Sequence, residues 1–201
     1  RRQRQMCIRD RKTNINLFAE GEVVYTDGGV LAEFAWILVV LPFIAALIIT
    51  FVGKSLPLKG AEVALGTIGI IFIYSTALMY LHVTKGVANE FFINVGNIGQ
   101  FDIEFGWVVD GLSIMMYFVV GLVALLVFIY ATNYMEGEIR YTFFFTSLTL
   151  FAGSMLVLVS SPTLIQILIG WELVGVCSYL LIGHYWEVKD NSSAAMKAFI
   201  T

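Results

Sequence analysis

The sequence predicts an all-α polytopic membrane protein with five transmembrane helices, the start of a sixth, and a small extramembrane β-hairpin between the second and third helices. Of its 201 residues, 59% are hydrophobic and 13% are charged, and the mean hydropathy is +0.84. These values lie far outside the range of a soluble domain. Uncharged runs recur along the chain, and about 20 helical residues cross a bilayer core. The runs are apolar on every face, whereas the strands of a barrel would alternate.

Residues 1–11 are predicted to be a sequencing-adapter artefact, and residues 12–32 an N-terminal segment outside the membrane. The outer segment carries Glu20, Glu22 and Asp27, whereas basic residues are favoured on the cytoplasmic side. A native polybasic arm that binds lipid is the alternative, and an artefact is to be excluded from fold reasoning. The basic residues in question are Arg1, Arg2, Arg4, Arg9, Arg11 and Lys12.

Residues 33–84 are predicted to form the first two transmembrane helices, from the uncharged runs Phe34–Val52 and Val63–Thr84. The short connection between these runs carries Lys54 and Lys59 and no acidic residue from 53 to 60. The positive-inside rule therefore places this connection in the cytoplasm and the N-terminus outside.

Residues 85–107 are predicted to form an outer loop that contains the β-hairpin. Two segments with apolar residues at every second position flank Gly96–Gln100, a Gly- and Asn-containing turn. Alternation around such a turn is typical of a hairpin. The alternating apolar residues are Phe91, Ile93 and Val95, followed by Phe101, Ile103 and Phe105.

Residues 108–201 are predicted to hold the third to fifth helices and the start of the sixth, as the beginning of a helical repeat. The break at Pro162 divides the long uncharged stretch after Tyr141 into two spans. The expected helices are Gly111 to about Ala131, Tyr141–Ser160, Thr163–Gly183, and a last one from about Ser193. Asp110 directly precedes the third helix and is expected mainly to cap its free backbone amides, with a supporting functional role as the alternative.

The cysteines and histidines predict no metal or redox site in this chain. Cys7, Cys177, His82 and His184 are isolated from one another, and no CxxC motif or Cys/His cluster occurs. Neither a dinucleotide fingerprint nor a phosphate loop is present. Cys177 is expected to be a packing residue, and any redox chemistry is expected to belong to partner subunits.

Glu172 is the single charged residue between Tyr141 and Trp186. It lies near the middle of the predicted fifth helix, and therefore near the midplane of the bilayer. A charged side chain costs on the order of 2.5–3.5 kcal/mol at that depth, so such residues usually mark an ion or proton path. The sequence thus predicts that Glu172 is a proton relay.

Three neighbours share the helical face of Glu172, at positions i+3, i+4 and i+7. Gly175 would leave space beside the carboxylate, Val176 follows it, and Tyr179 could offer a hydroxyl group. Trp171 lies deep in the predicted span and is expected to pack. Two structural interpretations of Glu172 remain open: it lies closer to an interface than the boundaries suggest, or it holds two helices together by a hydrogen bond.

The stretch 106–201 resembles the L-type, or chain 5, antiporter-like subunit of the proton-pumping NADH:quinone oxidoreductase, respiratory complex I. The matching segments are Val109–Ser113, Gly170–Gly183 and Ala194–Phe199. The resemblance implies two inverted helical repeats, neither of them complete in these 201 residues, so we expect an N-terminal fragment. It also implies that Glu172 corresponds to the family's transmembrane glutamate. The lysine partner on a later helix lies beyond this sequence.

Several expectations follow from this resemblance. Lys197 belongs to a matching segment, and we expect a snorkelling membrane anchor there, with a supporting role in pumping as the alternative. The expected partners are other membrane subunits of complex I and the lipid bilayer, without nucleic acid. NADH, FMN, iron–sulfur clusters and quinone would belong to partner subunits. The location implied is a bacterial inner or plasma membrane.

Two other functions stay open. The first is the large subunit of a multi-subunit cation/proton antiporter, whose corresponding segment is usually rich in Thr and Ser after Trp-Glu. Leu173–Cys177 favours complex I over that class. The second is a structural membrane subunit without its own proton path, in which Glu172 serves helix packing.

Overall fold

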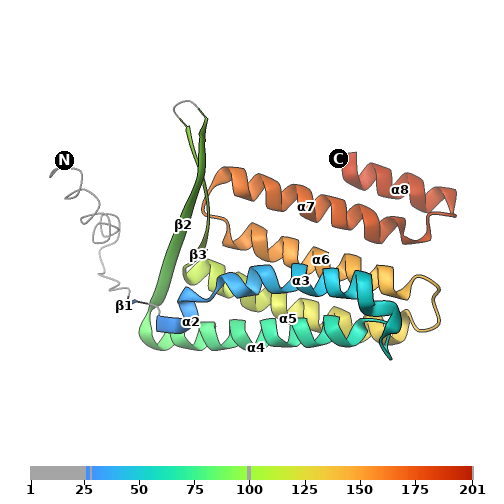
Figure 1. Cartoon of the computed structure of the whole chain (residues 1–201), viewed down its shortest axis with the longest axis horizontal. Coiled ribbons are helices and arrows are strands. Elements are labelled where there is room, and N and C mark those ends of the chain that lie inside the picture. Colours follow the sequence, from blue (N-terminus) through green and yellow to red (C-terminus); the bar gives the residue numbers. More distant parts are fainter. Residues whose placement is uncertain (1–25, 28, 99–100, 201) are drawn as a thin grey trace.

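The computed structural model describes residues 26–27, 29–98 and 101–200 (Figure 1). The prediction for residues 1–11 and most of that for 12–32 lie outside this part of the chain. The model confirms the predicted fold, with five helices long and apolar enough to cross a membrane. These five helices are α3 (Trp36–Val52), α4 (Ala61–Lys85), α5 (Gly111–Tyr134), α6 (Tyr141–Ser160) and α7 (Leu164–Ile182).

Shorter elements connect and extend the five spans. A 3-10 turn, η1, follows α3, and another, η2, follows α7. The hairpin lies between α4 and α5, and α8 follows η2. The bounds are β1 (Thr26–Asp27), α2 (Gly29–Glu33), η1 (Gly53–Ser55), β2 (Val87–Ile98), β3 (Phe101–Val109), η2 (Gly183–Tyr185) and α8 (Lys189–Ile200).

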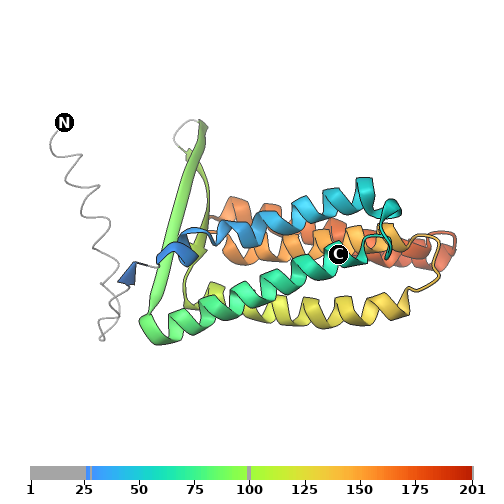
Figure 2. The same ribbon diagram turned by 60° about the horizontal axis from the view of Figure 1, so that its bottom comes forward.

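The spans run side by side, and β2 and β3 stand across one end of the bundle, here called the hairpin end (Figures 1 and 2). The other end, the opposite end, carries η1, the α5–α6 connection and η2. Helix α3 packs on α6, α4 packs on α5, and α7 packs on α6 and then on α8. Helices α7 and α8 therefore form an outer layer beside α6 (Figure 1).

Small residues allow the helix backbones to approach closely. Such close packing is usual in membranes, because lipid is as apolar as the helices and no hydrophobic effect drives them together. Pro42 is buried inside the continuous helix α3, and a Cβ placed on Gly153 of α6 would lie 3.1 Å from Pro42 Cβ. Between α6 and α7, a Cβ on Gly170 would lie 2.9 Å from Leu158 Cα. Pro42 thus serves the packing of α3 on α6.

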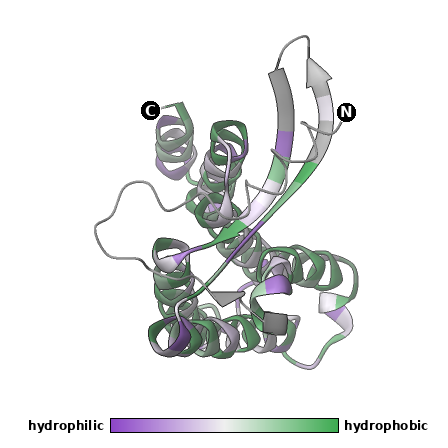
Figure 3. Ribbon diagram, turned by 90° about the vertical axis from the view of Figure 1, so that its left-hand side faces the viewer, coloured by the Kyte–Doolittle hydropathy of each residue, from purple (hydrophilic) through white to green (hydrophobic). Residues whose placement is uncertain are grey.

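The outward faces of the spans remain apolar, as a lipid-facing surface requires. The helices are coloured hydrophobic over most of their circumference (Figure 3). Exposed residues include Phe51 at 82% and Ile73 at 70%. This pattern confirms that the runs are apolar on every face.

Strands β2 and β3 form the predicted antiparallel hairpin, but β2 extends through Ile98, so Gly96, Asn97 and Ile98 pair with β3 and do not lie in the turn as predicted. Phe91 pairs with Trp107 and Phe92 with Gly106, and the Phe91 and Trp107 rings stack with centroids 4.5 Å apart. The register shifts by one residue between Asn94 and Gly96, which is typical of a β-bulge. A short parallel pairing of β1 with β2 was not predicted.

Two helix boundaries differ from the sequence prediction. Helix α8 begins at Lys189 rather than near Ser193, and the Ser192 backbone N–H donates to the Val188 carbonyl at 3.2 Å. Asp190 in its first turn complements the helix dipole there. Helix α5 continues past Ala131 to Tyr134. Hydropathy alone marks the apolar section of a helix and not its polar ends.

Gly106→Ala is expected to destabilise the hairpin, because the new Cβ would lie 1.9 Å from the Phe91 carbonyl oxygen. The strands would have to separate, at a cost of about 3 kcal/mol or more. Thermal unfolding of the full-length subunit in detergent measures this loss. Gly96→Ala is the matched control in the same hairpin, since a Cβ there meets nothing within 4 Å. Equal unfolding temperatures for both variants would contradict the packing described.

Candidate functional site

Helix α7 carries the candidate site and begins where the sequence predicts. Pro162 precedes it, and the Thr163 side chain accepts a hydrogen bond from the Gln166 backbone N–H at 3.4 Å, in the manner of an N-cap. The helix ends at Ile182, so Glu172 lies near its centre. The depth predicted for Glu172 therefore agrees with the helix bounds.

Glu172 lies on an exposed face of α7. Within the described part of the chain, no hydrogen bond or ion pair involves its side chain. In the most apolar window of the α7 span, 17% of the residues are buried, against 44% for α6. Trp171 is 67% exposed, so the expectation that it packs against other helices is wrong for the described chain. The reason is that α6 and α8 cover only part of the circumference of α7.

The face predicted for Glu172 continues into the groove between α7 and α8. A Cβ on Gly175 would meet nothing within 4 Å, so space does lie beside that position. Val176 and Tyr179 line a hollow of about 300 Å³. On its other side the hollow is lined by Met196, Phe199 and Ile200 of α8.

Tyr179 is held by its ring in this groove. The ring meets Phe199 of α8 edge-on, with centroids 5.9 Å apart and an interplanar angle of 60°. Among the described contacts, no hydrogen bond joins Tyr179 to Glu172, so the supporting role expected of its hydroxyl stays a prediction. Tyr179 also borders a second hollow of about 300 Å³ towards the opposite end. Arg140, Gly183, Trp186 and Ser192 are among the residues that line it.

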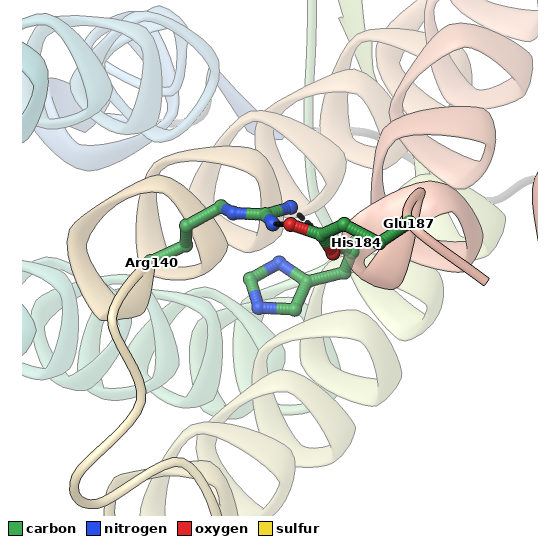
Figure 4. Close-up of polar contacts among 3 residues, drawn as sticks. All are labelled: Arg140, His184 and Glu187. Carbon is green, nitrogen blue, oxygen red and sulfur yellow. Dashed lines mark hydrogen bonds and ion pairs between the residues drawn. The ribbon is translucent and has the colours of Figure 1, made fainter.

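Arg140 ties the opposite end of α7 to the start of α6 (Figure 4). Its Nη1 donates to the His184 carbonyl oxygen at 2.6 Å, and its Nη2 forms an ion pair with Glu187. Its guanidinium carbon lies 5.2 Å from the centre of the Trp186 ring. This cluster was not predicted from the sequence. The sequence feature that could have indicated it is an arginine and a glutamate in two connections on the same side of the membrane.

The histidines lie at helix ends, and each makes contacts there. A ring nitrogen of His82 lies 2.7 Å from the Val87 carbonyl oxygen. His184 is 5% exposed, and its ring packs edge-on against Phe144, while its Nδ1 has no hydrogen-bond partner in the described structure.

Gln166 fastens the other end of α7 to the hairpin. Its Oε1 accepts from the Gly106 backbone N–H at 2.9 Å, and its Nε2 donates to the Gly106 carbonyl at 2.8 Å. Thr163 Oγ1 also donates to the Glu104 carbonyl at 3.1 Å. Gln166 was not predicted from the sequence as a site residue. The sequence feature that could have indicated it is an amide side chain within an apolar run.

Asp110 and Lys197 were the other predicted site residues. Asp110 Oδ1 accepts from the Ser113 backbone N–H at 2.7 Å, which confirms the predicted helix cap. Lys197 lies near the end of α8 and lines an open hollow together with Lys189 and Ser193. In the described residues, neither side chain is placed in contact with Glu172.

The described residues contain no group of three or more His, Cys, Asp or Glu side chains that could hold a metal ion. Cys177 is buried, and its sulfur lies 3.7 Å from Ser154 Oγ on α6. This environment is that of a packing residue, as expected.

Comparisons with known proteins indicate which class of membrane protein this chain resembles. Residues 96–145 match the family described as NADH-Ubiquinone oxidoreductase (complex I), chain 5 N-terminus. Residues 161–201 match the family described as NADH:quinone oxidoreductase/Mrp antiporter, TM. The fold also resembles a chain in the membrane-bound sulfane sulfur reductase, an archaeal respiratory membrane complex. The TM-score is 0.67 at 13% identity, over 83% of this chain and 33% of that one.

Relatives of this chain are named as subunits of NAD(P)H-quinone or NADH-quinone oxidoreductases. NAD(P)H-quinone oxidoreductase chain 5 of Synechocystis is 39% identical over 178 residues, which cover 85% of this chain and 26% of that protein. NADH-quinone oxidoreductase subunit L of Escherichia coli is 37% identical over 174 residues, covering 81% of this chain and 27% of that protein. The chain thus spans about a quarter of the length of these relatives.

Five apolar helices, a hairpin and a mid-span glutamate, together with these matches, define an antiporter-like membrane subunit. Within that class, the chain is similar to the L-type, or chain 5, subunits of NADH:quinone oxidoreductase, over most of its own length and about a quarter of theirs.

Asp110→Ala is expected to remove the α5 cap and lower stability by about 1 kcal/mol. Asp110→Asn keeps an oxygen acceptor for the Ser113 N–H and is expected to retain both stability and proton pumping. Thermal unfolding and pumping of the assembled complex measure the two effects. A normally stable Asn variant that fails to pump would show that Asp110 acts as more than a cap.

Proposed function

We propose that this chain is part of a proton-translocating membrane subunit of NADH:quinone oxidoreductase, and that Glu172 carries the proton. The observation that carries this proposal is a single carboxylate at the centre of a span, in a chain similar to the chain 5 subunits. The names of the relatives support it, since they are subunits of NAD(P)H-quinone or NADH-quinone oxidoreductases.

The charge of a carboxyl group within a membrane depends on which of two environments surrounds it. Lipid or protein of low polarity favours the neutral acid, whereas a nearby cation favours the carboxylate. A cation that moves towards or away from Glu172 would therefore change its proton occupancy. Such a change is what coupling to a reaction elsewhere in a complex requires.

The groove between α7 and α8 supports a route to Glu172 from the opposite end. The two hollows follow each other along α7 and share Tyr179. The hollow near Arg140 has a mainly apolar lining that includes the polar side chains of Arg140 and Ser192, and the one at Val176 is almost wholly apolar. We propose that water fills the first hollow and that the contact between Tyr179 and Phe199 restricts its passage, because apolar constrictions in channels gate by dewetting.

The remaining residues have supporting roles in this proposal. Gly175 leaves room beside Glu172, and Lys197 anchors α8 near the membrane surface. The partners are other membrane subunits of the complex and surrounding lipid, with no nucleic acid. We propose that NADH, FMN, iron–sulfur clusters and quinone are bound by those partner subunits. We place the protein in a bacterial inner or plasma membrane, with its N-terminus and the hairpin end outside.

The comparisons favour this function over a cation/proton antiporter. One matched family covers both classes, but the other names chain 5 of complex I alone. A purely structural role for Glu172 is the alternative that experiments on the full-length subunit must exclude.

Glu172→Gln is expected to lower proton pumping about tenfold or more while the complex still assembles. Glutamine keeps the shape of the side chain but cannot release a proton at this position. Glu172→Asp keeps the acid on a shorter arm and is expected to lose less. Proton uptake and NADH oxidation by the purified complex in vesicles give the pumped protons per NADH.

The order of the two variants separates the proton relay from a packing role. A side chain that holds helices together tolerates Gln better than Asp, whereas a relay tolerates Asp better. Normal pumping by an assembled Gln complex would remove Glu172 from the proton path.

The orientation predicts the labelling of two introduced cysteines, in a background where Cys7 is Ser and Cys177 is Ala. Glu90→Cys lies on an exposed position of β2 and is expected to react with an impermeant maleimide added to intact cells. Lys54→Cys, exposed in η1 at the opposite end, is expected to react only after permeabilisation. The reverse pattern would invert the proposed topology.

A further inference from the structure

The strongest polar contact of α7 outside the proposed proton path joins it to the hairpin. Gln166 is 7% exposed, and both polar atoms of its amide are bonded to the backbone of Gly106. The side chain presents one donor and one acceptor to the edge of β3, as a neighbouring strand would do. The first turn of α7 is thus joined to the hairpin through a buried contact.

The hairpin is closely packed at the point where Gln166 contacts it. Gly106 presses against the Phe91 carbonyl so closely that no side chain fits. The stacked rings of Phe91 and Trp107 flank the same position, and Thr163 Oγ1 bonds the Glu104 carbonyl nearby. A displacement of β3 would therefore move the first turn of α7 with it.

Helix α7 also packs along α6 and meets α8, and Arg140 ties its opposite end. The face that carries Glu172 is exposed in the described structure, so no other contact of the described chain fixes that side chain. Glu172 follows Gln166 by six residues, which is about 9 Å along the axis of a stiff helix. A shift or rotation imposed at Gln166 is consequently transmitted to the Glu172 carboxylate.

We propose that Gln166 is a positioning residue that couples the hairpin to the depth and direction of Glu172. This inference rests on the proposed function of Glu172 as the proton relay. Gln166 itself does not carry the proton, because its amide is fully engaged with Gly106. If the role of Gln166 were only structural, its side chain would do no more than form hydrogen bonds with two buried backbone groups.

The test uses the full-length subunit in its assembled complex in vesicles, with Gln166→Leu and Gln166→Glu. The Leu variant leaves the Gly106 N–H and C=O without partners and is expected to lower the protons pumped per NADH about two- to tenfold. The Glu variant distinguishes positioning from structure. As a carboxylate it has acceptors only, whereas the neutral acid offers one donor and one acceptor and reproduces both bonds.

Pumping by the Gln166→Glu complex is therefore expected to recover towards the wild-type ratio as the pH is lowered. Ser154→Ala is the matched control, since it removes a buried polar contact between α6 and α7 without touching the hairpin. It is expected to follow the pH profile of the wild type. A Gln166→Glu profile that matches the wild type would overturn the inference. An unchanged ratio in an assembled Gln166→Leu complex would do the same.

The double variant separates this inference from the proposed function. If both proposals hold, the Glu172→Gln complex and the complex with both substitutions show the same residual pumping at every pH. The reason is that the relay that Gln166 would position is gone. If Glu172→Gln alone pumps normally, the relay proposal fails. If the relay holds but the added Gln166→Glu still changes the residual ratio, Gln166 acts elsewhere and the positioning inference alone fails.

Discussion

The bilayer tolerates almost no polar group without a partner, and this constraint shapes each part of the structure. It makes the spans helical and directs hydroxyls on α6 back to their own backbone: Ser147 bonds the Phe143 carbonyl, Thr149 bonds Phe145 and Ser154 bonds Leu150. It also explains why the amide of Gln166, buried within an apolar run, pairs with both polar groups of one backbone residue. Glu172 stands out because no such partner lies in the described chain.

Local signals in the sequence were sufficient for most of the fold. The bounds of α6 agree residue for residue with the predicted Tyr141–Ser160, because polar residues flank an apolar run there. The cap at Asp110 and the alternation in the hairpin are likewise properties of neighbouring residues. The start of α8 was misplaced because its first turn is polar, and hydropathy does not distinguish a polar helical turn from a loop.

The site was only partly predictable, for a related reason. An isolated charge in an apolar run identifies Glu172 from the sequence alone. The contacts that fix its helix do not follow from local pattern: Gln166 meets Gly106 across 60 residues, and Arg140 meets Glu187 across 47. Trp171 was misjudged because its environment depends on which sides of α7 other helices cover. The contact between Tyr179 and Phe199 depends on the path of α8.

The lone acid in α7 also bears on how the chain enters the membrane. Nine leucines and isoleucines in this helix favour insertion by about 0.3–0.6 kcal/mol each, which together is close to the cost of one central carboxylate. Alone, α7 is therefore near the threshold for partitioning into lipid. The turn at Ser161–Thr163 joins it to α6, which has no acidic or basic residue. Entry of the two as one helical hairpin during biogenesis would spread the cost of the acid over both.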